Sequence, residues 1–314
     1  MGKKTGFRLR QGVPFSFTAS LSSAGVHGVS ESEGSLAVAC SDGNVRLFDD
    51  KGQPVYKLLL VKGYAGKSHY LAHSPDGALL AVTCSQTLFV VEVSTGEVLA
   101  SQRAETSDVS FGFCWAPDGE SLIWLTDSAM HRWRWSNGSL ERSPLTDRRW
   151  YAQRRWPRVA DERVFFGAAN THGGTAVLCF NWRSGAHLGT LGLQDGGQAD
   201  VPRLQPHAKG VVAWQPGLDP VLWDGTAPVP TRERSAPRTE HAQCFPEGFL
   251  SHTQVGGSWT HALILHDAAG GIQELRRAES FHLPSQQGPA LWLDSSELSE
   301  KPYGHRLERV VLPA

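Results

Sequence analysis

The sequence lacks the signatures that would place it among membrane proteins or in a known enzyme class. No uncharged apolar run reaches about 18 residues, so no transmembrane helix is expected. The charged start, MGKKTGFRLRQG, is followed by no apolar stretch, which argues against a secretory signal unless one has already been removed. The P-loop, GxSxG, HExxH and GxGxxG motifs are missing too. We therefore expect a cytoplasmic protein with no cofactor.

Cysteine is scarce and has no metal-binding pattern. The chain has five cysteines, an odd number, each inside an apolar run and far from the next: Cys40, Cys84, Cys114, Cys179 and Cys244. No CxxC or HxxxH spacing indicates zinc. We expect buried thiols in a reducing compartment. The net charge of −1 excludes a global attraction to nucleic acid or to a membrane surface.

Turn-forming and aromatic residues are abundant, which favours an all-β fold. The 314 residues include 33 glycines, 18 prolines and 11 tryptophans. Residues 68–97 read SHYLAHSPDGALLAVTCSQTLFVVEVSTGE, in which three short apolar runs alternate with turn clusters. Pro75 suits the second position of a tight turn, and Gly77 tolerates a positive φ. With a fourth run over 98–102, this stretch predicts a four-stranded antiparallel meander.

The same unit recurs along the chain. Gly34, Gly77 and Gly119 follow equivalent first strands at spacings of 43 and 42 residues. Weaker turns continue the series at spacings near 40, close to one propeller blade, and give about seven units. The second strands of the units are expected at 35–40, 78–84, 121–125, 163–167, 211–214, 249–252 and 290–293. The third strands are expected at 44–49, 87–93, 130–135, 175–182, 220–224, 261–266 and 306–311.

Particular motifs within the units resemble the WD-repeat β-propeller family. They are Ser41 to Asp49 (SDGNVRLFD), His73 to Gly77 (HSPDG), Trp115 to Gly119 (WAPDG) and the Trp-Asp ending of Val221 to Asp224. Gly63-Tyr64 stands where that family has Gly-His. The resemblance implies one all-β domain over residues 1–314, a single propeller of about seven four-stranded blades.

The N-terminal segment and two connecting segments have predicted places in the propeller. Closing a ring of blades removes an exposed sheet edge. The alternating Phe7-Arg8-Leu9-Arg10 predicts that residues 1–12 supply the outer strand of the last blade. Residues 147–158 and the proline-rich 226–237 are expected to be loops between blades.

Propeller enzymes assemble their sites from several blades at the central channel, so the missing motifs leave this possibility open. The first strand of each unit brings polar side chains to the channel rim: His27, His69, Asp108, Arg155, Asp200, His241 and His282. Convergent histidines and carboxylates could bind a metal or perform acid–base chemistry. The alternative is a solvated rim with no common geometry.

The most unusual stretch is 130–158, with eight arginines and two acidic residues, a local charge of +6. Arginine, tryptophan and tyrosine are enriched at interface hot spots, and arginine beside aromatic rings binds carboxylates, phosphates or stacked bases. In 130–135 the alternative is ordinary packing, with Trp133 and Trp135 between blades and Arg132 and Arg134 solvated on the other face. The predicted partner site is Arg148, Arg149, Trp150, Tyr151, Arg154, Arg155 and Trp156.

The sequence thus favours a non-catalytic protein-interaction scaffold that binds a partner with an acidic surface. A hydrolase or lyase with a His/Asp site at the central channel is the alternative. Binding of single-stranded nucleic acid is a third reading, which the near-zero net charge disfavours.

Overall fold

The computed structural model contains strands from one end of the chain to the other. It describes residues 10–17, 26–40, 42–60, 70–84, 87–103, 112–126, 129–145, 150–152, 157–170, 172–194, 201–207, 209–215, 221–226, 228–230, 241–245, 248–254, 261–267, 272–278, 280–282, 290–297 and 304–311. No helix occurs within these ranges, and so none that could cross a membrane.

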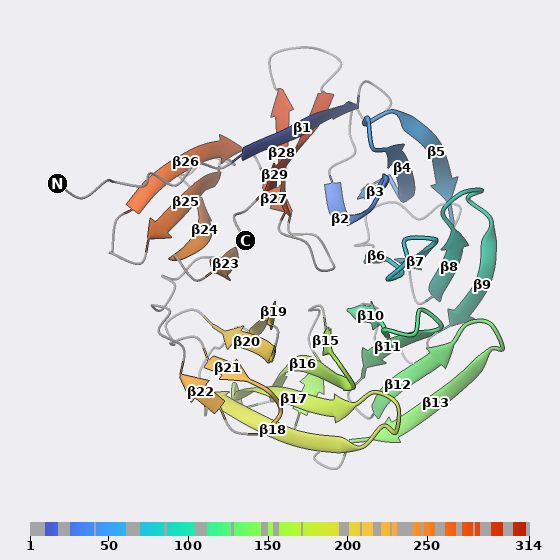
Figure 1. Ribbon diagram of the computed structural model, residues 1–314, viewed down its shortest axis with the longest axis vertical. Coiled ribbons are helices and arrows are strands. Elements are labelled where there is room, and N and C mark those ends of the chain that lie inside the picture. The colour runs from blue at the N-terminus through green and yellow to red at the C-terminus, as the bar shows by residue number, and fades with distance from the viewer. Residues whose placement is uncertain are drawn as a thin grey trace.

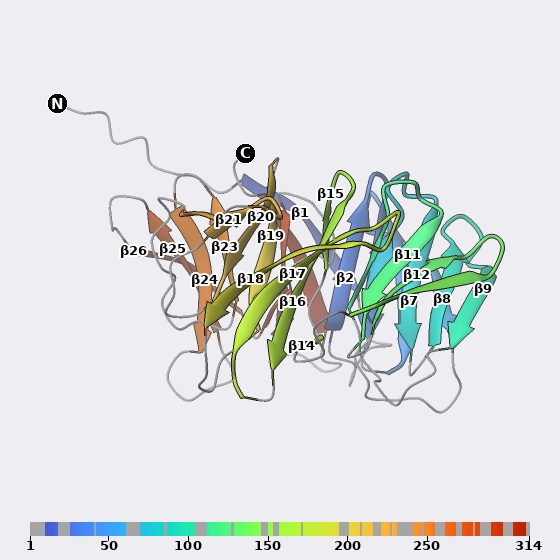
Figure 2. The ribbon, with the colours of Figure 1, turned by 90° about the horizontal axis from the view of Figure 1, so that it is seen from below.

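Seven antiparallel sheets stand side by side around a centre, as in a propeller (Figure 1). The strands run between two broad faces on which the turns gather (Figure 2). The predicted all-β class and the number of about seven blades are therefore confirmed for the described part of the chain. Blades 1 to 6 are numbered in chain order below, and blade 7 combines the last three strands with the first.

Blades 1 to 3 are regular four-stranded meanders, each ordered from the inner to the outer strand. Blade 1 consists of β2 (Val26–Ser32), β3 (Ser35–Cys40), β4 (Asn44–Asp49) and β5 (Pro54–Leu59). Blade 2 consists of β6 (Leu71–His73), β7 (Leu79–Cys84), β8 (Thr87–Glu92) and β9 (Val98–Arg103). Blade 3 consists of β10 (Phe113–Trp115), β11 (Ser121–Leu125), β12 (Ala129–Arg134) and β13 (Ser139–Pro144).

Blade 4 has a fifth strand, and blades 5 to 7 return to four. Blade 4 consists of β14 (Trp150–Ala152), β15 (Arg158–Ala160), β16 (Arg163–Asn170), β17 (Thr175–Asn181) and β18 (His187–Gln194). Blade 5 consists of β19 (Arg203–His207), β20 (Gly210–Trp214), β21 (Val221–Trp223) and β22 (Pro228–Pro230). Blade 6 consists of β23 (His241–Phe245), β24 (Gly248–Gln254), β25 (His261–Asp267) and β26 (Ile272–Ala278). Blade 7 consists of β27 (Ser280–His282), β28 (Ala290–Glu297), β29 (Gly304–Val311) and β1 (Arg10–Phe17).

The middle strands of blades 1 to 4 form the core, because each presents apolar side chains to the blade on either side. In β3 five successive residues are buried, and β16 has six buried residues in a row. Outer strands such as β5 and β9 alternate exposed and half-buried residues instead. A continuous apolar run therefore marks a strand that is covered on both faces, whereas alternation marks the rim.

The turn that joins β6 to β7 forms as its sequence predicts. The Gly77 amide donates to the Ser74 carbonyl at 2.9 Å, which places Pro75 and Asp76 at the two central positions. Gly77 has a φ of +74°, and a Cβ there would lie 3.1 Å from Oγ of Ser32 in blade 1. Glycine at this position thus serves both the turn and the contact between blades.

The Trp-Asp slot of the repeat performs two structural tasks. A large buried side chain ends the third strand, and a polar side chain follows that receives backbone amides of the next turn. Asp49 Oδ1 accepts from Lys51 at 2.9 Å, Asn181 Oδ1 from Arg183 at 3.0 Å, and Asp224 Oδ1 from Thr226 at 2.8 Å. This side-chain capping stabilises each of the three turns.

The N-terminal strand lies at the outer edge of the sheet that contains the C-terminal strands. β1 pairs antiparallel with β29, from Arg10 opposite Val311 to Phe17 opposite His305. The strand thus begins where the predicted segment 1–12 nearly ends, and Phe7 to Leu9 lie outside the described residues. Closure of the ring by this strand stays a prediction, which a truncation described below tests.

The proline-rich 226–237 contains a strand, unlike the loop that we predicted. β22 pairs with β21 as the outer strand of blade 5, with Pro228 opposite Trp223 and Pro230 opposite Val221. Proline is compatible with this place because an outer strand needs its backbone amides on one side only.

Candidate interaction surface at blade 4

The inner strand of blade 4 is divided into two pieces that pair with the same neighbour. β14 places Ala152 opposite Ala168 of β16, and β15 places Arg158 opposite Phe165. The chain advances six positions between these two pairs, whereas β16 advances three. Three residues more than the ladder needs therefore enter the chain between the two pieces.

This arrangement corrects the expectation that 147–158 is a loop between blades. Residues 150–152 and 158–160 both pair with β16 at the inner strand position of blade 4. β15 lies towards the centre of the ring (Figure 1). The density of arginine and tryptophan suggested a loop, but Trp150, Tyr151 and Val159 are residue types that strands favour. Both pieces pair antiparallel with β16, and the three surplus residues between them shift the register of the second piece relative to the first.

Most of the predicted partner site lies outside the described residues. Trp150 and Tyr151 are in β14, opposite Asn170 and Ala169. Arg148, Arg149, Arg154, Arg155 and Trp156 lie outside the described residues. The structure thus places only Trp150 and Tyr151 of the predicted site, and the site itself stays a prediction.

Arg158 anchors the C-terminal side of this segment. Its Nε donates to the Leu204 carbonyl of blade 5 at 3.1 Å, and its Nη1 donates to the Pro157 carbonyl at 3.3 Å. Burial lowers the pKa of Arg158 to about 10, and burial raises the pKa of the neighbouring Cys114 thiol to about 12. Arg158 therefore stays charged at neutral pH while Cys114 stays an unreactive thiol.

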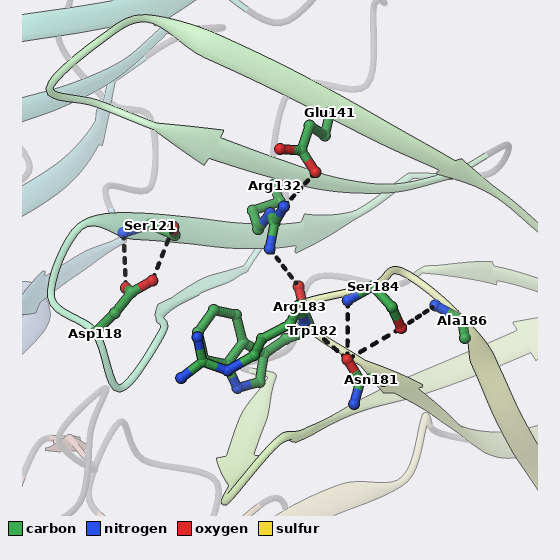
Figure 3. Close-up of polar contacts among 9 residues, drawn as sticks. All are labelled: Asp118, Ser121, Arg132, Glu141, Asn181, Trp182, Arg183, Ser184 and Ala186. Carbon is green, nitrogen blue, oxygen red and sulfur yellow. Dashed lines mark hydrogen bonds and ion pairs between the residues drawn. The ribbon is translucent and has the colours of Figure 1, made fainter.

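Strand β12 confirms one half of the packing alternative and contradicts the other. Trp133 is buried, Trp135 packs against the same cluster, and Arg134 is exposed. Arg132, expected to be solvated, is only 8% exposed. Its guanidinium pairs with Glu141 of β13 and donates to the Trp182 carbonyl of blade 4 at 3.4 Å (Figure 3). Arg132 is therefore a link between blades 3 and 4.

The sequence reading missed a second tryptophan–arginine pair, immediately after β17. The Trp182 ring is buried and its Nε1 donates to the Asp161 carbonyl at 3.0 Å. The Arg183 guanidinium lies 4.4 Å from the centre of that ring (Figure 3). Its Nε is 3.4 Å from Glu162. The sequence feature that could have predicted this pair is Trp182-Arg183 directly before Ser184-Gly185. It lies outside the arginine-rich residues 130–158.

The proposed channel residues are only partly placed. His27, His241 and His282 belong to β2, β23 and β27, the inner strands of three blades. His69, Asp108, Arg155 and Asp200 lie outside the described residues. Among the described side chains no group of three His, Cys, Asp or Glu residues could hold a metal ion. A convergent site at the rim stays a prediction.

His73 is buried at the interface between blades 1 and 2. In the sequence analysis it was named only as part of a turn motif and was assigned no role. Its Nδ1 lies 3.0 Å from the Ser30 hydroxyl and its Nε2 lies 3.2 Å from the Ser35 hydroxyl. Burial lowers the pKa of His73 to about 4. Burial thus keeps the imidazole neutral at neutral pH, and its two hydrogen bonds join blade 2 to blade 1.

The four described cysteines match the expectation of buried thiols. Cys40, Cys84, Cys114 and Cys179 are all buried and free of disulfide bonds. Cys244 belongs to β23, and its side chain lies outside the described part.

Comparison with known proteins supports the fold alone. No protein-family model matches the chain, and no curated protein matches it. Among solved structures it resembles the Cps50 (Swd1) β-propeller domain of Myceliophteria thermophila, with a TM-score of 0.57, 12% identity and coverage of 97% of this chain and 100% of that one.

Two further solved structures resemble the chain over most of its length. The WD40 repeats of RRP9 give a TM-score of 0.57 at 11% identity, covering 97% of this chain and 100% of that one. Raptor of Chaetomium thermophilum gives 0.64 at 12% identity, covering 92% of this chain and 28% of that one. The protein thus has the fold of WD40 β-propellers, as the motifs predicted, at only 11–12% sequence identity to these structures.

Proposed function

We propose that the protein is a non-catalytic interaction scaffold that binds an acidic surface of a partner protein at the inner strand of blade 4. The interruption of that strand supports the proposal most directly, since the surplus residues fall within the most arginine-rich part of the chain. The contact residues are Arg148, Arg149, Trp150, Tyr151, Arg154, Arg155 and Trp156.

The surroundings of the segment suit this role. β16 pairs with both pieces and also with the buried strand β17, so the segment is held at both ends by a rigid sheet. A rigid support lowers the entropy that a binding loop loses on contact. Arginine provides paired N–H donors for carboxylates, and tryptophan and tyrosine provide large contact area. These properties favour a protein partner with clustered acidic side chains.

Charge reversal tests the site. Arg148, Arg149, Arg154 and Arg155 are replaced together by Glu, and partners are captured by pull-down and identified by mass spectrometry. We expect loss of the partners that the unaltered protein retains, because the acidic partner surface would then meet eight units less of positive charge. Arg134→Glu is the matched control, since Arg134 is an exposed arginine outside this segment.

Partner retention by the quadruple variant, with an unchanged melting temperature, would contradict the site. Loss of partners in the Arg134→Glu control as well would point to a general effect of charge. Elemental analysis of the purified protein tests the competing hypothesis of an enzyme with a site at the central channel. A metal bound in stoichiometric amount would favour that enzyme over a non-catalytic scaffold.

A further inference from the structure

The outer strands of four blades share an unusual feature, an extra apolar residue at a β-bulge. In β5, Tyr56 and Pro54 pair with consecutive residues of β4 and leave Val55 between them. The register shifts in β9, β18 and β26 leave the equivalent residue unpaired in the same way. These extra residues are Val55, Leu99, Leu188 and Leu275. Because the same bulge occurs in the outer strands of four blades, it is a regular feature of this fold and not a local irregularity.

The side chains of the first three extra residues are exposed. Val55 is 52% exposed, Leu99 41% and Leu188 47%. Protection of an open sheet edge does not require an apolar residue here, because charge and proline serve that purpose better. β13, for example, carries Glu141, Arg142 and Pro144 along its edge. A bulge also disfavours the addition of a partner strand, so any contact at these points uses side chains.

The exposed apolar residues of blades 1 and 2 lie on outer strands that approach each other. A Cβ on Gly96, in the turn before β9, would lie 3.2 Å from the Tyr56 ring of β5. Val98, 42% exposed, pairs with Val91, which belongs to the cluster against which Tyr56 packs. β5 and β9 lie next to each other on the outside of the ring (Figure 1). Val55, Val98 and Leu99 therefore lie at neighbouring outer strands, and we call them the rim surface.

The turns beside the rim surface are acidic. Four carboxylates and one lysine flank β5 and β9 at this end: Asp49, Asp50, Lys51, Glu92 and Glu97. Glu97 is exposed and directly precedes Val98. Lys57 and Arg103 lie further along the same two strands. In blade 4 the turn before Leu188 carries exposed Arg183 instead, so the equivalent apolar residue there has a different electrostatic setting.

We propose that the rim surface of blades 1 and 2 is a second docking surface, for a basic amphipathic helix of a partner protein. Apolar side chains of the helix cover Val98 and Leu99, and its lysines or arginines approach Glu97 and Asp50. The surface is independent of the site proposed at blade 4, since it lies on other blades and has the opposite charge. A helix fits better than an extended segment because the bulges disfavour strand pairing.

A designed peptide tests the proposal directly. The probe is an amphipathic peptide of about 14 residues, long enough for roughly four helical turns, with leucine on one face and lysine on the other. We expect saturable binding in fluorescence anisotropy and a loss of roughly tenfold or more in affinity for the Val98→Ser/Leu99→Ser variant, since truncation of central apolar contacts has effects of this size. A peptide with glutamate in place of lysine should bind far more weakly.

Two further variants distinguish binding at the rim surface from nonspecific binding of the peptide to exposed apolar residues. Leu188→Ser removes an equally exposed leucine at the equivalent bulge of blade 4 and should leave peptide affinity unchanged. Glu97→Lys keeps every apolar residue and should weaken binding. The proposal fails if no saturable binding occurs, if the serine variant binds as tightly as the parent, or if Leu188→Ser weakens binding equally. Reversal of the blade 4 arginines should leave peptide affinity intact, which keeps the two proposals distinguishable.

Discussion

At the scale of single residues, the buried His73 between blades 1 and 2 makes the stability of the protein depend on pH. His73 is neutral at neutral pH because burial disfavours its charged form, and both ring nitrogens lie within hydrogen-bond distance of serine hydroxyls. The unfolded chain binds a proton at this residue near pH 6.5, whereas the folded protein does so only near pH 4. Stability is therefore complete above the unfolded pKa and is lost as the pH falls from 6.5 towards 4.

We expect His73 to contribute roughly 3 kcal/mol to this loss, at about 1.4 kcal/mol for each unit of pKa difference. His73→Gln removes the proton uptake and keeps a polar group between the serines. Urea unfolding at several pH values should show a flatter dependence for the variant between pH 4 and 6.5. Equal slopes for the variant and the parent would refute the assignment.

The ion pair of blade 1 is a second residue-scale determinant of stability. Arg46 is nearly buried, and its Nη1 and Nη2 lie 3.2 and 2.8 Å from the two carboxylate oxygens of Asp42. Partial burial opposes ionisation of Asp42, but the hydrogen bonds from Arg46 and from the Asn44 amide outweigh it and lower the pKa of Asp42. Asp42 thus holds the Arg46 guanidinium at the turn between β3 and β4.

Asp42→Ala should reduce the free energy of unfolding by roughly 2 kcal/mol, because it leaves the Arg46 charge buried without its carboxylate. The effect is smaller than for a fully buried pair, since Asp42 keeps 26% of its side chain exposed. The double variant Asp42→Ala/Arg46→Met should recover part of the loss in chemical denaturation. A single variant as stable as the parent would show that solvent replaces the carboxylate.

Residue-scale roles were predictable where the cause is local. The turn at Pro75 and Gly77 and the capping by Asp49 follow from neighbours in the sequence. The role of Arg132 was not, because its acceptor at Trp182 lies 50 residues away and its acid belongs to the next strand. A strand pattern shows which side chains share a face, and the solvation of that face depends on the adjoining blade.

At the scale of elements, the turn spacing and apolar runs were sufficient to place the middle strands. The expected 35–40 and 121–125 coincide with β3 and β11, and most other middle strands agree within a few residues. The inner strand of blade 4 was missed because three surplus residues interrupt it. A one-dimensional pattern treats such an interruption as a loop, although the ladder on β16 continues on both sides.

Removal of β1 tests whether the N-terminal strand closes the ring. Deletion of residues 1–17 would leave the edge of β29 that pairs with β1 without a partner strand. We expect a fall of roughly 5 °C or more in melting temperature, corresponding to about 2 kcal/mol or more for a chain of this size. Deletion of residues 1–9 alone is the control, because β1 begins at Arg10. An unchanged melting temperature after the longer deletion would contradict closure.

At the scale of the whole molecule, similar blades carry different surfaces. The sequence predicted the ring from its repeat, and it located the arginine-rich excess by composition alone. It could not reveal the rim surface, because Val55 and Leu99 look like ordinary strand residues until the register shows them to be extra. The net charge of the chain is −1, but its charges are unevenly distributed along the sequence. Acidic residues gather in the turns of blades 1 and 2, and arginines gather in residues 130–158.

The pairing of β1 with β29 also constrains how the chain reaches its folded state. Arg10 and Val311 are neighbours in the sheet although almost the whole sequence separates them. During synthesis β1 is made before every other described strand, and its partner strand emerges last among them. Blades 1 to 6 draw their strands from contiguous stretches, so each can form as it leaves the ribosome. Blade 7 has to wait, and until then the earliest strand is an unpaired edge that a chaperone or a second nascent chain can reach.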